Sequence, residues 1–415
     1  PYGRECISDM TSSDYQRPWT VLLMAAAFLV VITLGIRQSF GLFLLPITEA
    51  LGTGREVFSL GLAFQNLLWG ISSPFAGALA DKYGAGRIAA IGTIFYAGGL
   101  AVMAGFVTPG GMMMGHLMIG IGLGSAGVSI ALGAVARAVA PEKRSLALGM
   151  VTSIGSFGQF AILPITQIFI DGYGWQVSLL LLSGLSASML ASCLLLARDE
   201  TVRDVWTADI AKITMNSMLK TALSSTDYLL LTVGFFVCGI QVVFIATHLP
   251  TYLQDAGISP DIASWALGLV GLFNIIGSLL AGWLGSFISK KKLLAWLYLM
   301  RSVTILGFLA LPPSPITALL FGAAMGLLWL GTIPLTSGLI VVFFGPAFLS
   351  MLYGITFFSH QIGSFLGAWL GGWIYDNLGS YDMMWWLIIS SGIFAFIINS
   401  LIDENPKTIT TAPAE

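Results

Sequence analysis

The sequence predicts an all-α membrane protein with twelve transmembrane helices arranged as two halves of six. Three observations support this prediction. Hydrophobic residues make up 56% of the 415 residues and charged residues only 9%, whereas soluble domains carry about 25% charged residues. Twelve apolar runs are long enough to cross a bilayer as helices. The pattern of the first six runs also recurs in the last six.

The apolar runs are separated by short turns, with one long polar interval after the sixth. They cover residues 18–45, 57–80, 88–107, 111–139, 146–170, 176–197, 228–253, 262–287, 293–311, 315–344, 348–374 and 383–402. We therefore expect two six-helix domains at 18–197 and 228–402, joined by a cytosolic linker at 198–227. Residues 1–17 and 403–415 are expected to be cytosolic tails, since the first sixteen residues lack the apolar core of a signal peptide.

Lysine and arginine residues predict the orientation in the membrane. With the N-terminus inside, the outer loops contain only Arg55, and Arg37 and Arg301 lie within spans. All other basic residues fall on the inner side: Arg4, Arg17, Lys82, Arg87, Arg137, Lys143, Arg144, Arg198, Arg203, Lys212, Lys220, Lys290, Lys291, Lys292 and Lys407. By the positive-inside rule both termini are cytosolic. We expect the plasma membrane, or the cytoplasmic inner membrane if the source is bacterial.

The two halves repeat at an offset of 204 or 205 residues. The matched pairs are Gly77 with Gly282, Pro141 with Pro346, Gly149 with Gly354, Asp171 with Asp376, Gly174 with Gly379, Arg37 with Gln241, and Pro46 with Pro250. Repeats of this kind place a substrate site between the two halves near the bilayer midplane, with alternating access by rocking.

Arg37 is the residue around which the functional interpretation is built. It lies in the first span, nine residues before Pro46, which is about 14 Å of helix. An arginine at that depth costs at least roughly 2.5–3.5 kcal/mol of insertion free energy. No Asp or Glu lies in the central thirds of the spans to neutralise it. We interpret Arg37 as an anion-binding residue; the alternative is a structural arginine bonded to backbone carbonyls.

Several functional classes find no support in the sequence. There is no phosphate-binding loop of the Gly-x-x-x-x-Gly-Lys-Ser/Thr type, no nucleophile and base arrangement typical of an enzyme, and no long basic run for nucleic acid. Cys6, Cys193 and Cys238 lack metal or disulfide spacing. We therefore expect no enzyme activity, metal or cofactor.

The turn after the second span resembles the signature of the major facilitator superfamily. It reads Gly77-Ala-Leu-Ala-Asp81-Lys82-Tyr-Gly84 and then, after the departure Ala85-Gly86, Arg87. The resemblance implies two six-helix bundles related by a pseudo-two-fold axis along the membrane normal. It also implies that Gly77, Asp81, Lys82, Gly84, Arg87, Arg137 and Arg144 take part in conformational change, with Arg87 holding the opposing bundle.

Within that superfamily the chain resembles the monocarboxylate transporter and oxalate:formate antiporter branch. The similar segments are Gly35-Ile-Arg37 with Pro46, Arg137 to Arg144, Tyr353-Gly354 leading to His360, and Asp376 to Tyr381. The chain departs from the antiporter, which has a glutamine at Arg37 and a lysine at His360. Both relatives have an arginine where this chain has Ser278, so the identity of the anion is left open.

This resemblance implies a secondary transporter of a small organic anion, in particular a monocarboxylate, coupled to protons or working by exchange. The candidate substrate-binding residues are Arg37, Gln38, Phe40, Gln241, Asn274, Trp329, His360 and Gln361. Each amide or aromatic among them is either a ligand or a packing residue. Gln241 is favoured because the repeat places it opposite Arg37.

His360 and His248 are the proton-coupling candidates, because histidine changes charge near neutral pH. His116, at the start of the fourth span, is expected at the outer surface. The competing functions are a drug or metabolite exporter in which Arg37 is structural, and a transport-inactive sensor. The expected partners are the organic anion, protons and the bilayer, and we expect a monomer.

Overall fold

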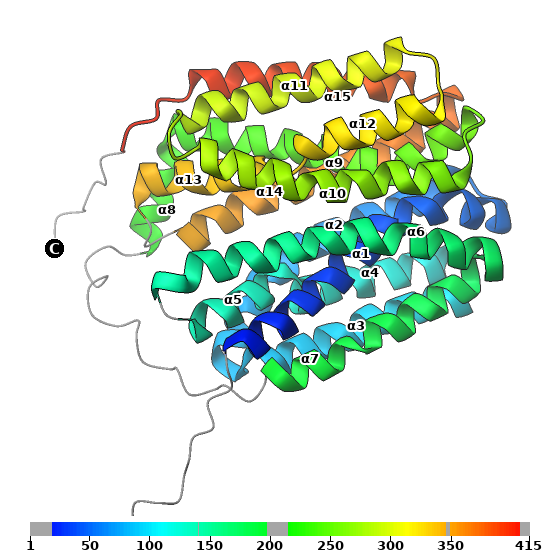
Figure 1. Cartoon of the computed structure of the whole chain (residues 1–415), viewed down its shortest axis with the longest axis horizontal. Helices are drawn as coiled ribbons and strands as arrows, with labels where there is room; N and C mark the ends of the chain where they lie inside the picture. The colour runs from blue at the N-terminus through cyan, green and yellow to red at the C-terminus, as the bar shows by residue number, and fades with distance from the viewer. Residues whose placement is uncertain (1–18, 140, 197–214, 346–348, 407–415) are drawn as a thin grey trace, which may run out of the picture.

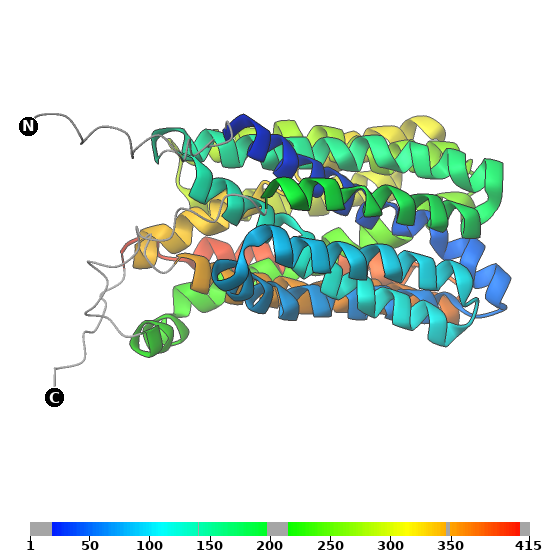
Figure 2. The same cartoon turned by 90° about the horizontal axis from the view of Figure 1, so that it is seen from below.

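The structure is a computed structural model that describes residues 19–139, 141–196, 215–345 and 349–406. In these ranges the chain is helical, and its long helices lie along one axis (Figure 1). Helix α1 begins and α15 ends at the same end of the molecule, which we call the terminal end, and we call the opposite end the far end (Figures 1 and 2). The view turned by 90° shows the same lengthwise packing (Figure 2).

Among the described residues, the first half contains seven helices that account for six predicted spans. They are α1 (Trp19–Leu51), α2 (Arg55–Tyr83), α3 (Ala85–Gly105), α4 (Pro109–Ala126), α5 (Val128–Ala138), α6 (Pro141–Ala187) and α7 (Met189–Leu196). Helices α4 and α5 share the fourth span. The backbone of α6 is non-helical at Gly174, so its two parts correspond to the fifth span and most of the sixth.

The second half occupies the upper part of Figure 1. It comprises α9 (Thr226–Asp255), α10 (Pro260–Leu284), α11 (Lys290–Ala310), α12 (Pro315–Leu327), α13 (Thr332–Phe344), α14 (Leu349–Leu378) and α15 (Asp382–Leu401). Within the interval predicted as a linker, residues 215–224 form the helix α8 (Met215–Ser224). The rest of that interval, the first seventeen residues and residues 407–415 lie outside the described residues.

Local sequence signals explain where several helices begin. Ser259 accepts a hydrogen bond from Ile262 N at the start of α10, and Ser314 accepts one from Thr317 N at the start of α12. A proline follows each serine, where its missing N–H removes no helical hydrogen bond. These side chains satisfy backbone donors that the first turn of a helix leaves unpaired.

Two turns confirm the sequence repeat at the level of the backbone. Gly174 in the first half has φ +77°, and Gly379, 205 residues later, has φ +71°. A positive φ is open to glycine without steric penalty. The repeated glycines therefore reverse the chain at equivalent points, between the fifth and sixth spans of each half.

The fourth span of each half is interrupted. In the first half the break is at Gly127, between α4 and α5. In the second half it covers residues 328–331, between α12 and α13, and here side chains from other helices bind the freed backbone. Leu330 N donates to Asn274, and the Leu328 carbonyl accepts from Arg301. Irregular backbone inside a membrane needs such internal partners.

The main contacts between the two halves are those of α1 with α9, α2 with α14, and α6 with α10. Helices α1 and α9 approach each other closely at Gly41 of α1. A Cβ atom built on Gly41 would lie 2.4 Å from the Ala246 carbonyl oxygen of α9, so only glycine fits there. A large hydrophobic cluster fills each half, and a small cluster of Ala63, Val243 and Ala368 packs between the halves.

By length and composition, nine helical stretches among the described residues can cross a membrane. One of them, Ala147–Leu196, is 50 residues long and contains the reversal at Gly174. Helices α2 and α14 are not in this set. They face each other at the interface between the halves, where Gln361 of α14 packs against Gly70 of α2.

Candidate functional site

Arg37 lies on α1 at the interface between the halves, with its guanidinium held by α2. Its Nη2 donates to Asn66 Oδ1 at 2.8 Å, and its Cζ lies 4.9 Å from the centroid of the Trp69 ring. Asn66 Nδ2 in turn donates to the Leu62 carbonyl at 2.8 Å, which fixes the amide with its oxygen toward Arg37. Arg37 Nε is buried without a protein hydrogen-bond partner. No carboxylate of the described residues lies within ion-pairing distance of Arg37.

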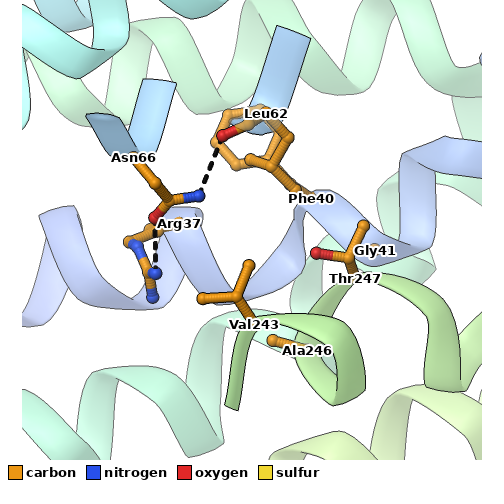
Figure 3. A pocket seen from close by; sticks show the side chains of 8 residues that line it. All are labelled: Arg37, Phe40, Gly41, Leu62, Asn66, Val243, Ala246 and Thr247. Atoms are coloured by element: carbon orange, nitrogen blue, oxygen red, sulfur yellow. Dashed lines mark hydrogen bonds between the residues drawn. The ribbon is translucent and has the colours of Figure 1, made fainter. Parts of the chain in front are cut away.

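A small cavity adjoins this guanidinium and lies between the two halves (Figure 3). Its volume is about 10 Å³, close to the minimum that holds one water molecule. Its walls come from α1, α2 and α9: Arg37, Phe40, Gly41, Leu62, Asn66, Val243, Ala246 and Thr247. A positive charge at one end and apolar walls along the sides suit a short organic anion better than a cation.

Of the other predicted binding residues, Phe40 lines this cavity, whereas Gln38 of α1 and Gln361 of α14 do not. Gln38 and Gln361 are buried, and neither amide oxygen nor amide nitrogen has a protein partner in either residue. Gln361 packs against Gly70 of α2. Gly70 is one turn from Asn66, so Gln361 lies near the Arg37 site on the side of the second half.

The prediction that Gln241 faces Arg37 across the cavity is wrong in this structure. Gln241 is fully buried inside the second half, where Nε2 donates to the Ile388 carbonyl at 2.9 Å and Oε1 accepts from Arg301 Nη1 at 3.4 Å. Arg301 also donates to the backbone carbonyls of Leu328 and Trp329. The side chain of Gln241 lies on a face of α9 turned toward α11 and α15.

Trp329 and Asn274, both predicted to bind substrate, meet at the interrupted fourth span of the second half: Trp329 lies in the break, and Asn274 of α10 binds its backbone. Trp329 is buried, and its backbone carbonyl accepts from Arg301. Asn274 Oδ1 accepts from Leu330 N at 3.0 Å, while its Nδ2 donates to Ser156 Oγ of the first half at 3.1 Å. Neither residue lines the Arg37 cavity. Asn274 instead ties the break in the second half to α6 of the first.

The two histidines predicted for proton coupling have different surroundings. His360 is 8% exposed, its Nδ1 lies 3.3 Å from Ser364 Oγ, and its ring stacks with Phe357. His248 is fully buried, with Nε2 at 2.8 Å from the Ala368 carbonyl and Nδ1 at 3.1 Å from the Tyr381 hydroxyl. Because Nε2 donates to a carbonyl, the neutral His248 ring accepts from Tyr381.

The expectation that His116 lies at the outer surface is also wrong. His116 is fully buried in the first half, where its Nδ1 lies 2.8 Å from Gln65 Oε1. Its ring packs edge-on against Phe58. Sequence position near the start of a span did not reveal that α2 covers this residue.

Sequence reasoning missed a cluster of polar contacts at the far end, which we call the far-end clamp (Arg55, Glu56, Asp255, Asp376 and Tyr381). Arg55 of the first half binds Asp255 of the second through Nη1 at 2.6 Å and Nη2 at 2.8 Å. Its Nη1 also donates to Tyr381 Oη at 3.0 Å. Asp376 accepts from the backbone N–H groups of Arg55 and Glu56 at 2.9 and 2.7 Å.

The clamp therefore caps the first turn of α2 with a carboxylate from the other half. A carboxylate at a helix N-terminus is favoured both by the free N–H groups and by the helix dipole. The available signal was that Arg55 is the only basic residue in the loops on that side, with acids at the ends of α9 and α14. What those acids contact could not be deduced from their positions.

The predicted conformational motif lies at the terminal end, between α2 and α3. Gly84 has φ +95° and ends α2, and Arg87 Nη1 donates to the Tyr83 carbonyl at 3.4 Å. Lys82 lies 5.1 Å from the centroid of the Tyr83 ring, and a Cβ atom on Gly77 would meet no neighbour. The side chains of Asp81, Arg137 and Arg144 lie outside the described residues.

Among the residues that the structure describes, no group of three or more His, Cys, Asp or Glu side chains lies close enough to hold a metal ion. Cys193 and Cys238 are buried free thiols. The side chains at the Arg37 site itself offer hydrogen bonding and positive charge.

The chain is similar in sequence to one protein family and to several of its members. The family model of the Major Facilitator Superfamily matches residues 23–259 and 229–415. The uncharacterised MFS-type transporter YcxA of Bacillus subtilis is 27% identical over 385 residues, 88% of this chain and 90% of the relative. Monocarboxylate transporter 13 of Rattus norvegicus is 26% identical, over 88% of this chain and 83% of its own length. Monocarboxylate transporter 12 of Homo sapiens is 26% identical over 62% of this chain and 56% of its own length.

Proposed function

The chain belongs to the Major Facilitator Superfamily, and we propose that it is a secondary transporter of a small monocarboxylate that binds at Arg37. The observation that carries this proposal is the position of the Arg37 guanidinium. It lies between the two halves, is oriented by Asn66, and has no carboxylate partner among the described residues. A charge kept inside a membrane without a counter-ion is expensive, which favours a role in binding an anion.

Arginine suits this role because of its geometry. Its planar guanidinium offers parallel N–H donors that match the two oxygens of a carboxylate. In Arg37 only Nη2 is used by a protein acceptor, the Asn66 amide oxygen, and Nε is left without one. Relatives that carry the name monocarboxylate transporter support the same class of substrate.

The composition of the cavity supports a mechanism of alternating access. Arg37 and Asn66 belong to the first half, and Val243 and Thr247 belong to the second. A cavity of about 10 Å³ is too small for a carboxylate, so the two walls must separate to admit one. Rocking of the halves about this interface separates them and is the motion expected for internally repeated transporters.

The structure represents a state closed at the far end by the clamp around Arg55. If the basic residues mark the cytosolic side, the far end is the outer end and this state excludes the outside. Both termini are then cytosolic in the plasma membrane. We infer that the clamp must open before an external anion reaches Arg37.

For proton coupling we favour His360 over His248. Both ring nitrogens of His248 are engaged inside the second half, so a change of charge there would disrupt packing. His360 lies on α14, whose neighbouring Gln361 packs against α2 of the first half, and it is the more exposed of the two. A proton on His360 would supply a positive charge from the second half to offset the negative charge of a bound carboxylate.

The test is uptake of radiolabelled carboxylates into proteoliposomes, with and without an imposed pH gradient. We expect saturable uptake of at least one short monocarboxylate, and loss of binding in Arg37→Gln. One guanidinium hydrogen bond to a charged group contributes roughly 1.5–3 kcal/mol. The affinity should therefore fall by about ten- to a hundredfold, with Arg37→Lys recovering part of the loss.

The alternative is an exporter of apolar compounds in which Arg37 is structural. The apolar walls of the cavity, Phe40, Leu62, Val243 and Ala246, are the observation in its favour. It predicts that Arg37→Gln folds poorly but binds its ligand normally. Measuring melting temperature and carboxylate affinity on the same purified variant separates the two functions.

A further inference from the structure

The hydroxyl of Thr247 is a second polar group in the Arg37 cavity, and no predicted role accounts for it. Thr247 lies on α9 and faces the cavity from the half opposite to Arg37, with its oxygen directed into the space between the two walls (Figure 3). The residue is 1% exposed, and its Oγ1 has no protein hydrogen-bond partner.

This arrangement differs from that of many buried threonines in these helices. Thr33, Thr48 and Thr93 each donate to the carbonyl four residues earlier at 2.8 Å, which satisfies the hydroxyl within its own helix. Thr247 does not make this bond to Val243. A buried hydroxyl without a partner is destabilising, so its retention in a cavity wall points to a ligand.

Thr166, Thr251 and Thr336 also have buried hydroxyls without protein partners. None of the three lines the Arg37 cavity, so burial alone does not single out Thr247. Three properties together single out Thr247. Its hydroxyl has no protein partner, it lines the cavity that Arg37 also lines, and it does so from the opposite half. Thr251, one turn farther along the same helix, provides a natural control.

We propose that Thr247 selects substrates by binding an uncharged polar group of the molecule whose carboxylate binds Arg37. This inference rests on the proposed function and adds a specificity-determining residue to it. It also supplies the contact from the second half that Gln241 was expected to make.

The spacing of the two groups indicates the kind of molecule. A Cβ atom built on Gly41 would lie 2.9 Å from the Thr247 carbonyl oxygen, so Thr247 is level with Gly41. Gly41 is four residues beyond Arg37, which is about 6 Å along the helix. This short offset between the backbones of Arg37 and Thr247 favours a short acid whose second polar group lies a few bonds from the carboxylate.

The chemistry of the wall narrows the class further. A threonine hydroxyl can both donate and accept a hydrogen bond, so it suits a hydroxyl or carbonyl group. No cationic side chain lines the Thr247 end of the cavity, whose other walls there are Gly41, Val243 and Ala246. A second carboxylate would be desolvated there without a counter-charge. Hydroxy- or oxo-monocarboxylates should therefore bind better than alkyl monocarboxylates or dicarboxylates.

The experiment measures binding of butyrate, 3-hydroxybutyrate and succinate to purified protein in lipid nanodiscs. Thr247→Val removes the hydroxyl and keeps the shape of the side chain, Thr247→Ser restores a hydroxyl, and Thr251→Val removes an unpaired hydroxyl outside the cavity. We expect the unmodified protein to bind 3-hydroxybutyrate roughly three- to tenfold more tightly than butyrate, as for one neutral hydrogen bond. Thr247→Val should reduce this ratio to about one, and Thr247→Ser and Thr251→Val should preserve it.

Two results would overturn the inference. One is equal affinity for butyrate and 3-hydroxybutyrate in the unmodified protein, and the other is an unchanged preference in Thr247→Val. If Arg37→Gln still lowers butyrate affinity in either case, the proposed anion carrier survives and only the role of Thr247 fails. If no acid binds the unmodified protein, or Arg37→Gln binds all three acids normally, the proposed function fails and the inference fails with it.

Discussion

Removing the guanidinium of Arg55 should open the far end of the molecule. Arg55→Ala eliminates the bonds from Nη1 and Nη2 to Asp255, at 2.6 and 2.8 Å, and the bond to Tyr381. It leaves the two bonds from the α2 backbone to Asp376, because those use N–H groups that alanine keeps. The variant therefore weakens the clamp without abolishing it.

The size of the effect follows from the burial of the pair. Two hydrogen bonds between charged groups would contribute roughly 3–6 kcal/mol if fully buried. The Asp255 side chain is 31% exposed, and solvent screening lowers the value of such pairs. We therefore expect Arg55→Ala to destabilise the closed state by about 2 kcal/mol. This change shifts the equilibrium between closed and open states by about thirtyfold.

Spin labels can measure this shift directly. Ala50 and Ala256 are exposed residues at the far end, one in each half, and both can be replaced by Cys and labelled. Double electron–electron resonance should show a longer, broader distance distribution in Arg55→Ala than in the parent. The charge-swapped pair Arg55→Asp with Asp255→Arg should restore part of the short distance. Lys220→Ala, which removes an exposed charge from α8, should leave it unchanged.

An unchanged distance distribution in Arg55→Ala would refute the assignment of Arg55 as a gate residue. An equal shift in Lys220→Ala would instead attribute the effect to net charge. Adding Asp376→Asn to Arg55→Ala tests the remaining contact, since an amide oxygen caps a helix less strongly than a carboxylate near the helix dipole. The double variant should populate the open state more than either single variant.

Three further predictions concern the interior. Arg301→Gln should lower the melting temperature and the yield of folded protein, because Arg301 donates hydrogen bonds to backbone carbonyls at the break near Trp329. The folded protein that remains should bind carboxylate normally. A loss of affinity without a loss of stability would contradict this structural role. His360→Gln should abolish accumulation driven by a pH gradient while preserving exchange of internal for external substrate in proteoliposomes, and full gradient-driven accumulation would reject His360 as the proton carrier. Gly41→Val should impair transport strongly, because its side chain would meet the Ala246 carbonyl, and normal uptake would show that α1 and α9 need not approach so closely.

The family and the architecture could be predicted without coordinates because they depend on patterns local in the chain. Apolar runs long enough to cross a bilayer define the helices, and the repeated Gly174 and Gly379 mark equivalent reversals. The resemblance to the major facilitator superfamily is confirmed by the family model. The interrupted fourth spans were not predicted, because Gly127 and residues 328–331 lie in runs that remain apolar throughout.

The individual site residues were harder to predict, and Gln241 shows why. A repeat in sequence transfers depth in the membrane from Arg37 to Gln241, but the direction of a side chain depends on the rotation of its helix within the bundle. That rotation results from packing against neighbours. On α9 it turns Gln241 toward Arg301 and turns Thr247 toward the cavity.

The sequence by itself predicted that the chain crosses a membrane in two repeated halves, and that Arg37 lies in an apolar run with no acid in any predicted span to neutralise it. Those properties follow from hydrophobicity and spacing along the chain. Only the tertiary structure decided which groups meet. Asn66 binds Arg37 within the first half, and across the two halves Thr247 lies opposite Arg37, while Asp255 and Asp376 lie on the first turn of α2. Asp255 is 200 residues from Arg55 and Asp376 is 321, and contacts over such separations arise when helices pack together, since spacing along the chain carries no information about them.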